Sequence, residues 1–163
     1  MNVSLSFAEG ELTPNELAEA LDTLPAALEN QLKQAATDIW STIEAEAKDN
    51  APVDTGALRA SIRSTVEEVG ATILHIRIGS SQEYAAAQEF GTDPFFPPPS
   101  ALREWARSVL GDADAAYPVA RSISESGLEA QPYLRPAFRD NIRFIVDRIN
   151  DAVDSAFAEV GLA

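Results

Sequence analysis

Residues 13–32 read TPNELAEALDTLPAALENQL and contain the start of a long helix. Thr13 suits the capping position and Pro14 the first helical position. Glu16 stands three residues after the cap, where its side chain can reach back to the backbone and complete a capping box. The pattern continues beyond this stretch, so we predict one long amphipathic helix that ends near Asn50.

One face of this predicted helix is apolar at three- and four-residue steps, through Leu17, Leu21, Leu24, Leu28, Leu32, Ala36, Ile39, Ile43 and Ala47. Pro25 should kink the helix or split it in two, because proline lacks a backbone N–H. A second stripe with near-heptad spacing runs from Leu134 to the end and predicts a long closing helix. We interpret both stripes as surfaces packed on a sheet rather than as a coiled coil.

Between the two helices the pattern changes to alternation, which is typical of half-buried strands. The apolar positions are Leu58, Ala60, Ile62 and Val66 in the first predicted strand and Leu74, Ile76 and Ile78 in the second. Because Gly70 lies between them, the two strands should form an antiparallel hairpin. Residues 84–90 fit either a third strand or a helical turn.

Residues 93–99 read DPFFPPP, which predicts a stiff, irregular connector. Short helices are predicted over residues 101–110 and from Pro118 to Gly127, where glycine can end a helix. The elements together predict an α+β domain. We place an irregular arm at residues 1–12 and a single domain at residues 13–163, with an insertion at about 93–130.

The composition limits the chemistry that the chain can perform. Among 163 residues there is no cysteine and a single histidine, His75, so disulfides, thiolate nucleophiles and a conventional zinc site are excluded. Acidic residues outnumber basic ones by 26 to 12, a formal charge of −14 that repels nucleic acid and anionic membranes. Either a saline habitat or the composition of the genome would account for this charge. Because the sequence shows neither a signal peptide nor a membrane span, we expect synthesis in a cytoplasm.

The stretch Asp54-Thr55-Gly56 matches the active-site turn of aspartic proteases, in which two such aspartates share one proton. A dimer could supply the second aspartate. That turn follows a strand in the proteases, however, whereas here it follows a helix and Pro52. We favour a structural turn in which Asp54 accepts a backbone hydrogen bond and Gly56 supplies conformational freedom. We therefore predict no catalytic residue, no cofactor and no metal.

Basic side chains gather on the polar faces of the two predicted strands, at Arg59, Arg63, His75 and Arg77. Like charges opposed across strands are destabilising. The basic residues should therefore meet an anionic partner, either an acidic patch on a neighbouring subunit or passing nucleic acid, or else pair with Glu67 or Glu68. The sequence leaves both explanations open.

Three motifs occur in the order APVDTGALRASI at residues 51–62, YAAAQEFGT at 84–92 and QPYLRPAF at 131–138. In this order, between two long helices, they resemble the tail-completion, or head–tail joining, family of long-tailed phages and related viruses, also called minor tail components. The resemblance implies a long helix laid on a small sheet and a structural subunit without catalytic residues or cofactors. It also implies assembly as a ring where the tail tube meets the head connector.

Carried onto this chain, the resemblance implies that Asp54, Thr55 and Gly56 orient the first strand. It implies that residues 89–92 form a loop entry and that residues 132–136 set the final helix. The stretch 93–130 is longer than in the shorter members of the family.

We therefore predict a virion protein of the neck, with a tail-tube terminator as the alternative role. Its expected partners are copies of itself in a sixfold ring, the tail tube or terminator protein, and head connector proteins. Genome DNA would only pass through the lumen, and no membrane is involved. The predicted assembly interface comprises Arg59, Arg63, His75, Arg77, Glu89, Phe90, Thr92, Phe95 and Phe96.

Overall fold

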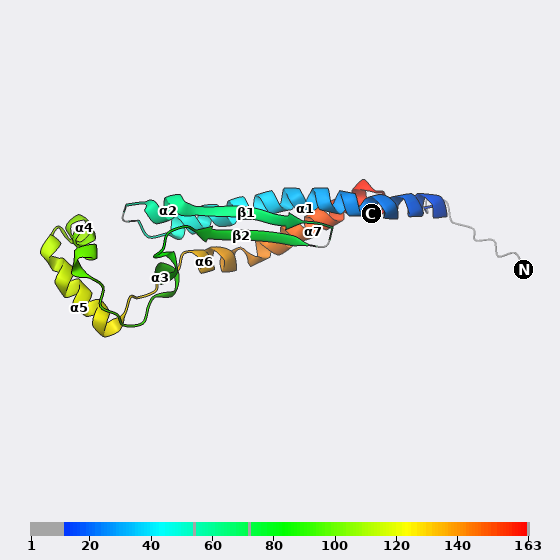
Figure 1. Cartoon of the computed structure of the whole chain (residues 1–163). Helices are drawn as coiled ribbons and strands as arrows, with labels where there is room; N and C mark the ends of the chain where they lie inside the picture. The colour runs from blue at the N-terminus through cyan, green and yellow to red at the C-terminus, as the bar shows by residue number, and fades with distance from the viewer. Residues whose placement is uncertain (1–11, 54, 72, 163) are drawn as a thin grey trace, which may run out of the picture. The chain divides into compact units, whose positions relative to one another are not determined.

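The computed structural model describes residues 12–53, 55–71 and 73–162 (Figure 1). The elements in these residues are α1 (Pro14–Asn50), α2 (Ala57–Ser61), β1 (Ile62–Val69), β2 (Leu74–Ser80), α3 (Ala85–Phe90), α4 (Pro99–Leu110), the 3-10 helix η1 (Ala113–Ala115), α5 (Ala116–Ser126), α6 (Leu134–Asp140) and α7 (Ile142–Glu159). β1 and β2 form a two-stranded antiparallel sheet. The predicted α+β fold, with a long helix at either end, is confirmed. The predicted arm, apart from Leu12, lies outside the described residues.

α1 begins with the predicted capping box. The Thr13 N–H donates to Glu16 Oε2 at 2.8 Å, and the Glu16 N–H donates to Thr13 Oγ1 at 3.3 Å. The helix is not split at Pro25, which lies inside it. The missing N–H would have bonded the carbonyl of Leu21, a residue that is 54% exposed, so water can solvate that carbonyl.

The predicted first strand is partly wrong, because residues 57–61 are the short helix α2. Gly56, at φ 78°, reverses the chain, and its carbonyl accepts a hydrogen bond from the Ala60 N–H at 2.9 Å. Leu58 and Ile62 are both buried. A spacing of four fits one face of a helix as well as one face of a strand, so alternation alone could not separate the two. The strand begins at Ile62.

The hairpin turns at Gly70, as predicted. Gly70 and Ile73 exchange backbone hydrogen bonds of 2.8 and 3.4 Å. In β2 the apolar side chains are less exposed than His75 and Arg77, which confirms the alternation there. In β1, Val66 is 40% exposed instead of facing the core.

The chain divides into two compact units. The first comprises residues 1–40, 66–77 and 143–163. Its core joins Leu32 and Ala35 of α1 to Ala152 of α7, and Val69 and Ile149 pack against them. Two polar contacts also join α1 to α7. The Arg148 guanidinium lies 2.5 Å from the Asp38 carboxylate, and the Gln31 side chain donates a 3.0 Å hydrogen bond to Glu159. In this unit the two predicted stripes pack on each other and on the end of the hairpin.

The second unit comprises residues 41–65 and 78–142. Ile43 and Ala47 of α1 are buried there with Leu58 and Ile62. Helix α3 resolves the ambiguity at residues 84–90 in favour of a helix, and residues 93–98 are neither helix nor strand, as predicted.

The last predicted helix is two helices, α6 and α7, and the break at Asn141 is a correction. The Asn141 Nδ2 donates to the Ala137 carbonyl at 2.8 Å and to the Glu46 carboxylate. The Asn141 N–H donates to the Phe138 carbonyl at 3.3 Å. This hydrogen bond spans three residues, as in a 3-10 helix, instead of the four of an α-helix. The partner Glu46 lies far away in the sequence, so the apolar spacing alone could not predict the break.

The inserted helices follow the prediction with two shifts. Helix α4 begins at Pro99, which was predicted to belong to the connector, instead of at Ala101. The second helix begins at Ala116 instead of Pro118, because η1 leads into it. Gly127 ends it at φ 76° and ψ −166°. The φ is positive, as expected of a terminating glycine, but the ψ lies outside the left-handed helical region.

Glu44 joins α1 to β1. Its side chain is only 12% exposed and lies 2.5 Å from Lys48 Nζ. Its carboxylate also accepts the Ser64 hydroxyl and, at 2.8 Å, the Ser64 N–H. Burial opposes ionisation, but the hydrogen bonds from Lys48 and Ser64 outweigh it, so the pKa of Glu44 is lowered.

A carboxyl group with a lowered folded-state pKa stabilises the protein above its unfolded pKa, and this contribution disappears as the pH falls through the folded pKa. Glu44→Gln should therefore cost about 1.5–3 kcal/mol at neutral pH, the value of a hydrogen bond to a charged group. In urea unfolding, the difference from wild type should shrink well below about pH 4. The control is Asp49→Asn, an exposed carboxylate one turn away. A Glu44→Gln penalty that stayed constant down to pH 3 would contradict the assignment.

Candidate functional site

The second and third motifs are joined through one buried carboxylate. Glu89 is 5% exposed and is the one charged side chain buried among the described residues. Its Oε2 accepts the N–H groups of Tyr133 and Leu134, both at 2.8 Å, and its Oε1 accepts that of Arg135 at 2.9 Å. These N–H groups form the start of α6, where a helix has unsatisfied donors and the positive end of its dipole. Glu89 therefore caps a helix 44 to 46 residues further along the chain.

The surroundings of Glu89 are closely packed. Tyr133 is 2% exposed, and its burial, followed by the Glu89 carboxylate, raises the pKa of its hydroxyl. The Arg135 Nε lies 3.9 Å from Glu89 Oε1, and its guanidinium stands 5.1 Å from the centre of the Phe90 ring. Phe90 itself is 67% exposed. The sequence placed Glu89 and Phe90 in one loop entry, but it did not indicate that Glu89 positions the third motif.

Backbone pairs extend this connection on both sides. The Gln131 N–H donates to the Gln88 carbonyl at 2.8 Å, and the two side-chain amides are joined at 3.0 Å. Thr92 and Leu128 form an antiparallel bridge, in which the Thr92 N–H donates to the Leu128 carbonyl at 3.0 Å. The Leu128 N–H returns a bond to Thr92 Oγ1 at 3.1 Å. Residues 88–92 and 128–135 thus form one hydrogen-bonded frame.

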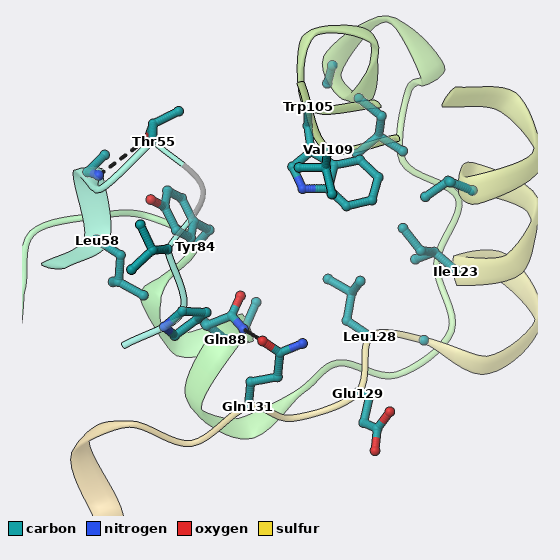
Figure 2. Close-up of a pocket in the computed structure, with 18 of the residues that line it drawn as sticks. Thr55, Leu58, Tyr84, Gln88, Trp105, Val109, Ile123, Leu128, Glu129 and Gln131 are labelled. Carbon is teal, nitrogen blue, oxygen red and sulfur yellow. Dashed lines mark hydrogen bonds between the residues drawn. The ribbon is translucent and has the colours of Figure 1, made fainter. Parts of the chain in front are cut away.

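An apolar pocket of about 1020 Å³ lies in the second unit, beside this frame (Figure 2). All three motifs and the insertion line it: Pro52, Val53, Thr55, Gly56, Ala57, Leu58, Tyr84, Ala87, Gln88, Ala101, Leu102, Trp105, Val109, Val119, Ser122, Ile123, Gly127, Leu128, Glu129 and Gln131. Figure 2 shows Trp105, Val109 and Ile123 across the pocket from Leu58 and Tyr84. Motifs far apart in the sequence thus border one cavity.

This pocket is better suited to binding an apolar surface than to acid–base chemistry. Among the described residues, its lining contains one carboxylate, Glu129, and no histidine or basic residue. No group of three metal-ligating side chains occurs within the described part of the chain. Asp54 lies outside the described residues. The neighbouring Thr55 and Gly56 do form a turn, in which Thr55 Oγ1 accepts the Ala57 N–H at 3.3 Å.

The basic residues singled out in the sequence are not all in the same situation. His75 Nδ1 lies 3.7 Å from Glu68, and Arg77 Nε lies 2.9 Å from Glu67. For these two residues the structure therefore agrees with the explanation that the basic side chains pair within the chain. Arg63 donates to the Ile62 carbonyl at 2.7 Å. Within the described residues Arg59 has no carboxylate partner. Arg59 and Arg63 belong to the second unit, and His75 and Arg77 to the first.

The aromatic residues of the connector are accessible. Phe95 and Phe96 are 44% and 52% exposed. The Phe96 ring meets Tyr117 edge-on, with centroids 6.3 Å apart and planes at 67°. Exposed apolar side chains that gather in one region are typical of protein–protein contacts. Their accessibility is compatible with the predicted assembly interface, which stays a prediction.

Residues 15–91 match the model of the HK97-gp10-like family, described as "Bacteriophage HK97-gp10, putative tail-component". The matched segment contains α1 except for Pro14, the hairpin and the first motif, with nearly all of the second. It confirms the resemblance to tail-completion and head–tail joining proteins. No curated protein and no solved structure matches the chain. Of the helices in the described residues, none has the length and apolar content needed to span a membrane.

Proposed function

We propose that the chain is a structural subunit of the neck and not an enzyme, because residues 15–91 match the model of a family that is described as a tail component of phages. In this proposal, copies of the chain form a ring, most readily of six, that joins the tail tube to the head connector. Its partners are the neighbouring copies, the tail tube or its terminator protein, and the connector proteins. Genome DNA passes through the ring without being recognised.

The observation that carries the proposal is the match across α1, the hairpin and the first two motifs. The arrangement of the second unit supports it. Hydrogen bonds centred on Glu89 fix a frame, and the frame borders an open apolar pocket instead of a cluster of reactive groups. Closed rings form when one surface of a subunit meets a different surface of the next copy. A pocket and exposed apolar residues elsewhere on the chain are surfaces of this kind.

The test is to make particles of the virus that encodes this chain with its gene deleted. We expect filled heads and free tails of normal length, counted by electron microscopy, and almost no joined particles. Purified wild-type protein added to the mixture should restore joining, because the two parts are otherwise complete. Overlong tails would identify a tail-tube terminator instead, since only a terminator stops the growth of the tube.

Two further outcomes would overturn the proposal. Joined, infective particles without the protein would remove it from the neck. An Asp54→Asn variant that fails to restore joining, although it folds as the wild type does, would revive the protease interpretation. We expect this variant to restore joining fully, because a turn tolerates asparagine in place of aspartate.

A further inference from the structure

Three large apolar side chains form an exposed stripe along α6 and the start of α7. Phe138, Ile142 and Val146 are 54%, 49% and 49% exposed. The two helices are separated only by Asn141, so steps of four residues keep these side chains along one side. The exposed stripe borders the buried side of α7, where Ile149 packs against the core. Nothing in the described part of the chain covers it.

The charges beside the exposed stripe differ between its two ends. Residues 135–143 contain three arginines and one aspartate, whereas residues 147–159 contain four carboxylates and one arginine. Neighbouring elements add the carboxylates of Glu46 and Glu89 to the first half and that of Asp38 to the second. With these included, the first half has three arginines against three carboxylates, and the second has one arginine against five carboxylates. The second half is thus strongly acidic and the first is not.

This gradient of charge decides how a second copy can lie on the exposed stripe. Two parallel stripes would set the acidic halves against each other, and like charges across a contact are unfavourable. Two antiparallel stripes set the arginines of each copy beside the carboxylates of the other. The Arg139 and Asp147 side chains are 71% and 63% exposed, so both can reach a second copy. The antiparallel arrangement also brings Phe138 of one copy to Val146 of the other, with Ile142 at the centre.

We propose that two copies of the chain pair through the exposed stripe, with their α7 helices antiparallel and Ile142 on the two-fold axis. Such a contact is symmetric and closes at two copies, so it is not the contact that closes a ring. It is a state of the free protein, in which the apolar stripe is covered. Two helical segments of three to four turns should bury less than the roughly 1,200 Å² of a stable interface, so the dimer is weak and reversible.

The absence of cysteine from the chain allows a test by self-cross-linking. A residue on a two-fold axis meets its own counterpart, and a disulfide needs Cβ atoms about 4 Å apart. Under mild oxidation of the purified protein, Ile142→Cys should form covalent dimers at least about tenfold faster than Val109→Cys, because pairing raises the local thiol concentration. Val109 is a matched control in α4, at 51% exposure. Equal rates for the two variants would overturn the inference, as would a wild-type protein that sediments as a monomer at about 1 mM.

Charge reversal separates this antiparallel pairing from other association. Arg139→Glu and Asp147→Arg should each raise the Kd of the dimer about tenfold in sedimentation experiments, because each sets like charges together twice across the two-fold axis. Both side chains are exposed, so the melting temperature should be unchanged. An equimolar mixture of the two variants should recover the wild-type affinity, since each introduced charge then meets an introduced charge of opposite sign.

A mixture that associates no more tightly than either variant alone would overturn the inference. These measurements use the free protein, so their outcome does not depend on the proposed role in the neck. That role is tested separately by the deletion of the gene, and either proposal can fail while the other stands.

Discussion

Replacing Gly127 with alanine is expected to lower the free energy of unfolding of the second unit by about 3–5 kcal/mol. Gly127 adopts φ 76° and ψ −166°, a backbone region reserved for glycine. An added Cβ would stand 2.0 Å from the Thr92 carbonyl oxygen and 3.0 Å from the Asp93 carbonyl carbon. Neither is the end of a flexible side chain. The clash is relieved only if the bridge between Thr92 and Leu128 opens.

Gly111→Ala is the matched control. Gly111 also has a positive φ, of 75°, but an added Cβ there would meet no atom within 4 Å. It should cost only about 1–2 kcal/mol, the strain of a left-handed residue. Urea unfolding followed by tryptophan fluorescence can compare the two, since Trp105 lines the pocket. Similar losses for both substitutions would show that the backbone at Thr92 yields, contrary to this account.

Glu89→Gln is expected to cost about 3 kcal/mol or more, because the carboxylate accepts three backbone N–H groups and charged hydrogen bonds contribute about 1.5–3 kcal/mol each. Glutamine keeps the shape but retains a single acceptor oxygen, and its amide group opposes donors at the start of α6. Hydrogen exchange should then show earlier opening of residues 131–138. Amide exchange there can be followed by mass spectrometry.

The control for that substitution is Glu83→Gln, at an exposed position shortly before α3. Its effect should stay within about 0.5 kcal/mol, as for most surface changes. If Glu89→Gln unfolds at the same urea concentration as Glu83→Gln, the carboxylate does not hold the two motifs together. Because the mutated residue lies outside the pocket lining, any loss of particle joining in Glu89→Gln would be read as a loss of the frame.

Features with a local cause could be predicted from the sequence. The capping box of Thr13 and Glu16 involves atoms three residues apart, and the turn at Gly70 is closed by its own neighbours. The irregular connector follows from consecutive prolines, which lack the backbone N–H that a regular element needs beyond its first turn. The stripes of the two long helices needed only their spacing. Each of these signals lies within a few residues of the structure that it specifies.

The helix α2 was missed although its cause is local. A helix and a strand present Leu58 and Ile62 on one face equally well, so the choice depended on the left-handed conformation of Gly56, which the spacing does not reveal. Features with a distant cause could not be predicted. The break at Asn141 depends in part on Glu46, and the start of α6 depends on Glu89. For the candidate site, the three motifs correctly indicated segments that line the pocket. The sequence could not show that they border one pocket, because the insertion supplies the opposite wall.

The bridge between Thr92 and Leu128 has a consequence for how this protein can diversify. It brings the entry and the exit of residues 93–127 side by side, so the two inserted helices form a module with a closed stem. Such a module can be lengthened, trimmed or exchanged at small entropic cost, because the ends are already held together. One wall of the pocket belongs to α2 and α3, and the other to this exchangeable module. A change of module would therefore alter what the pocket accepts while leaving the hairpin, Glu89 and the first turn of α6 in place.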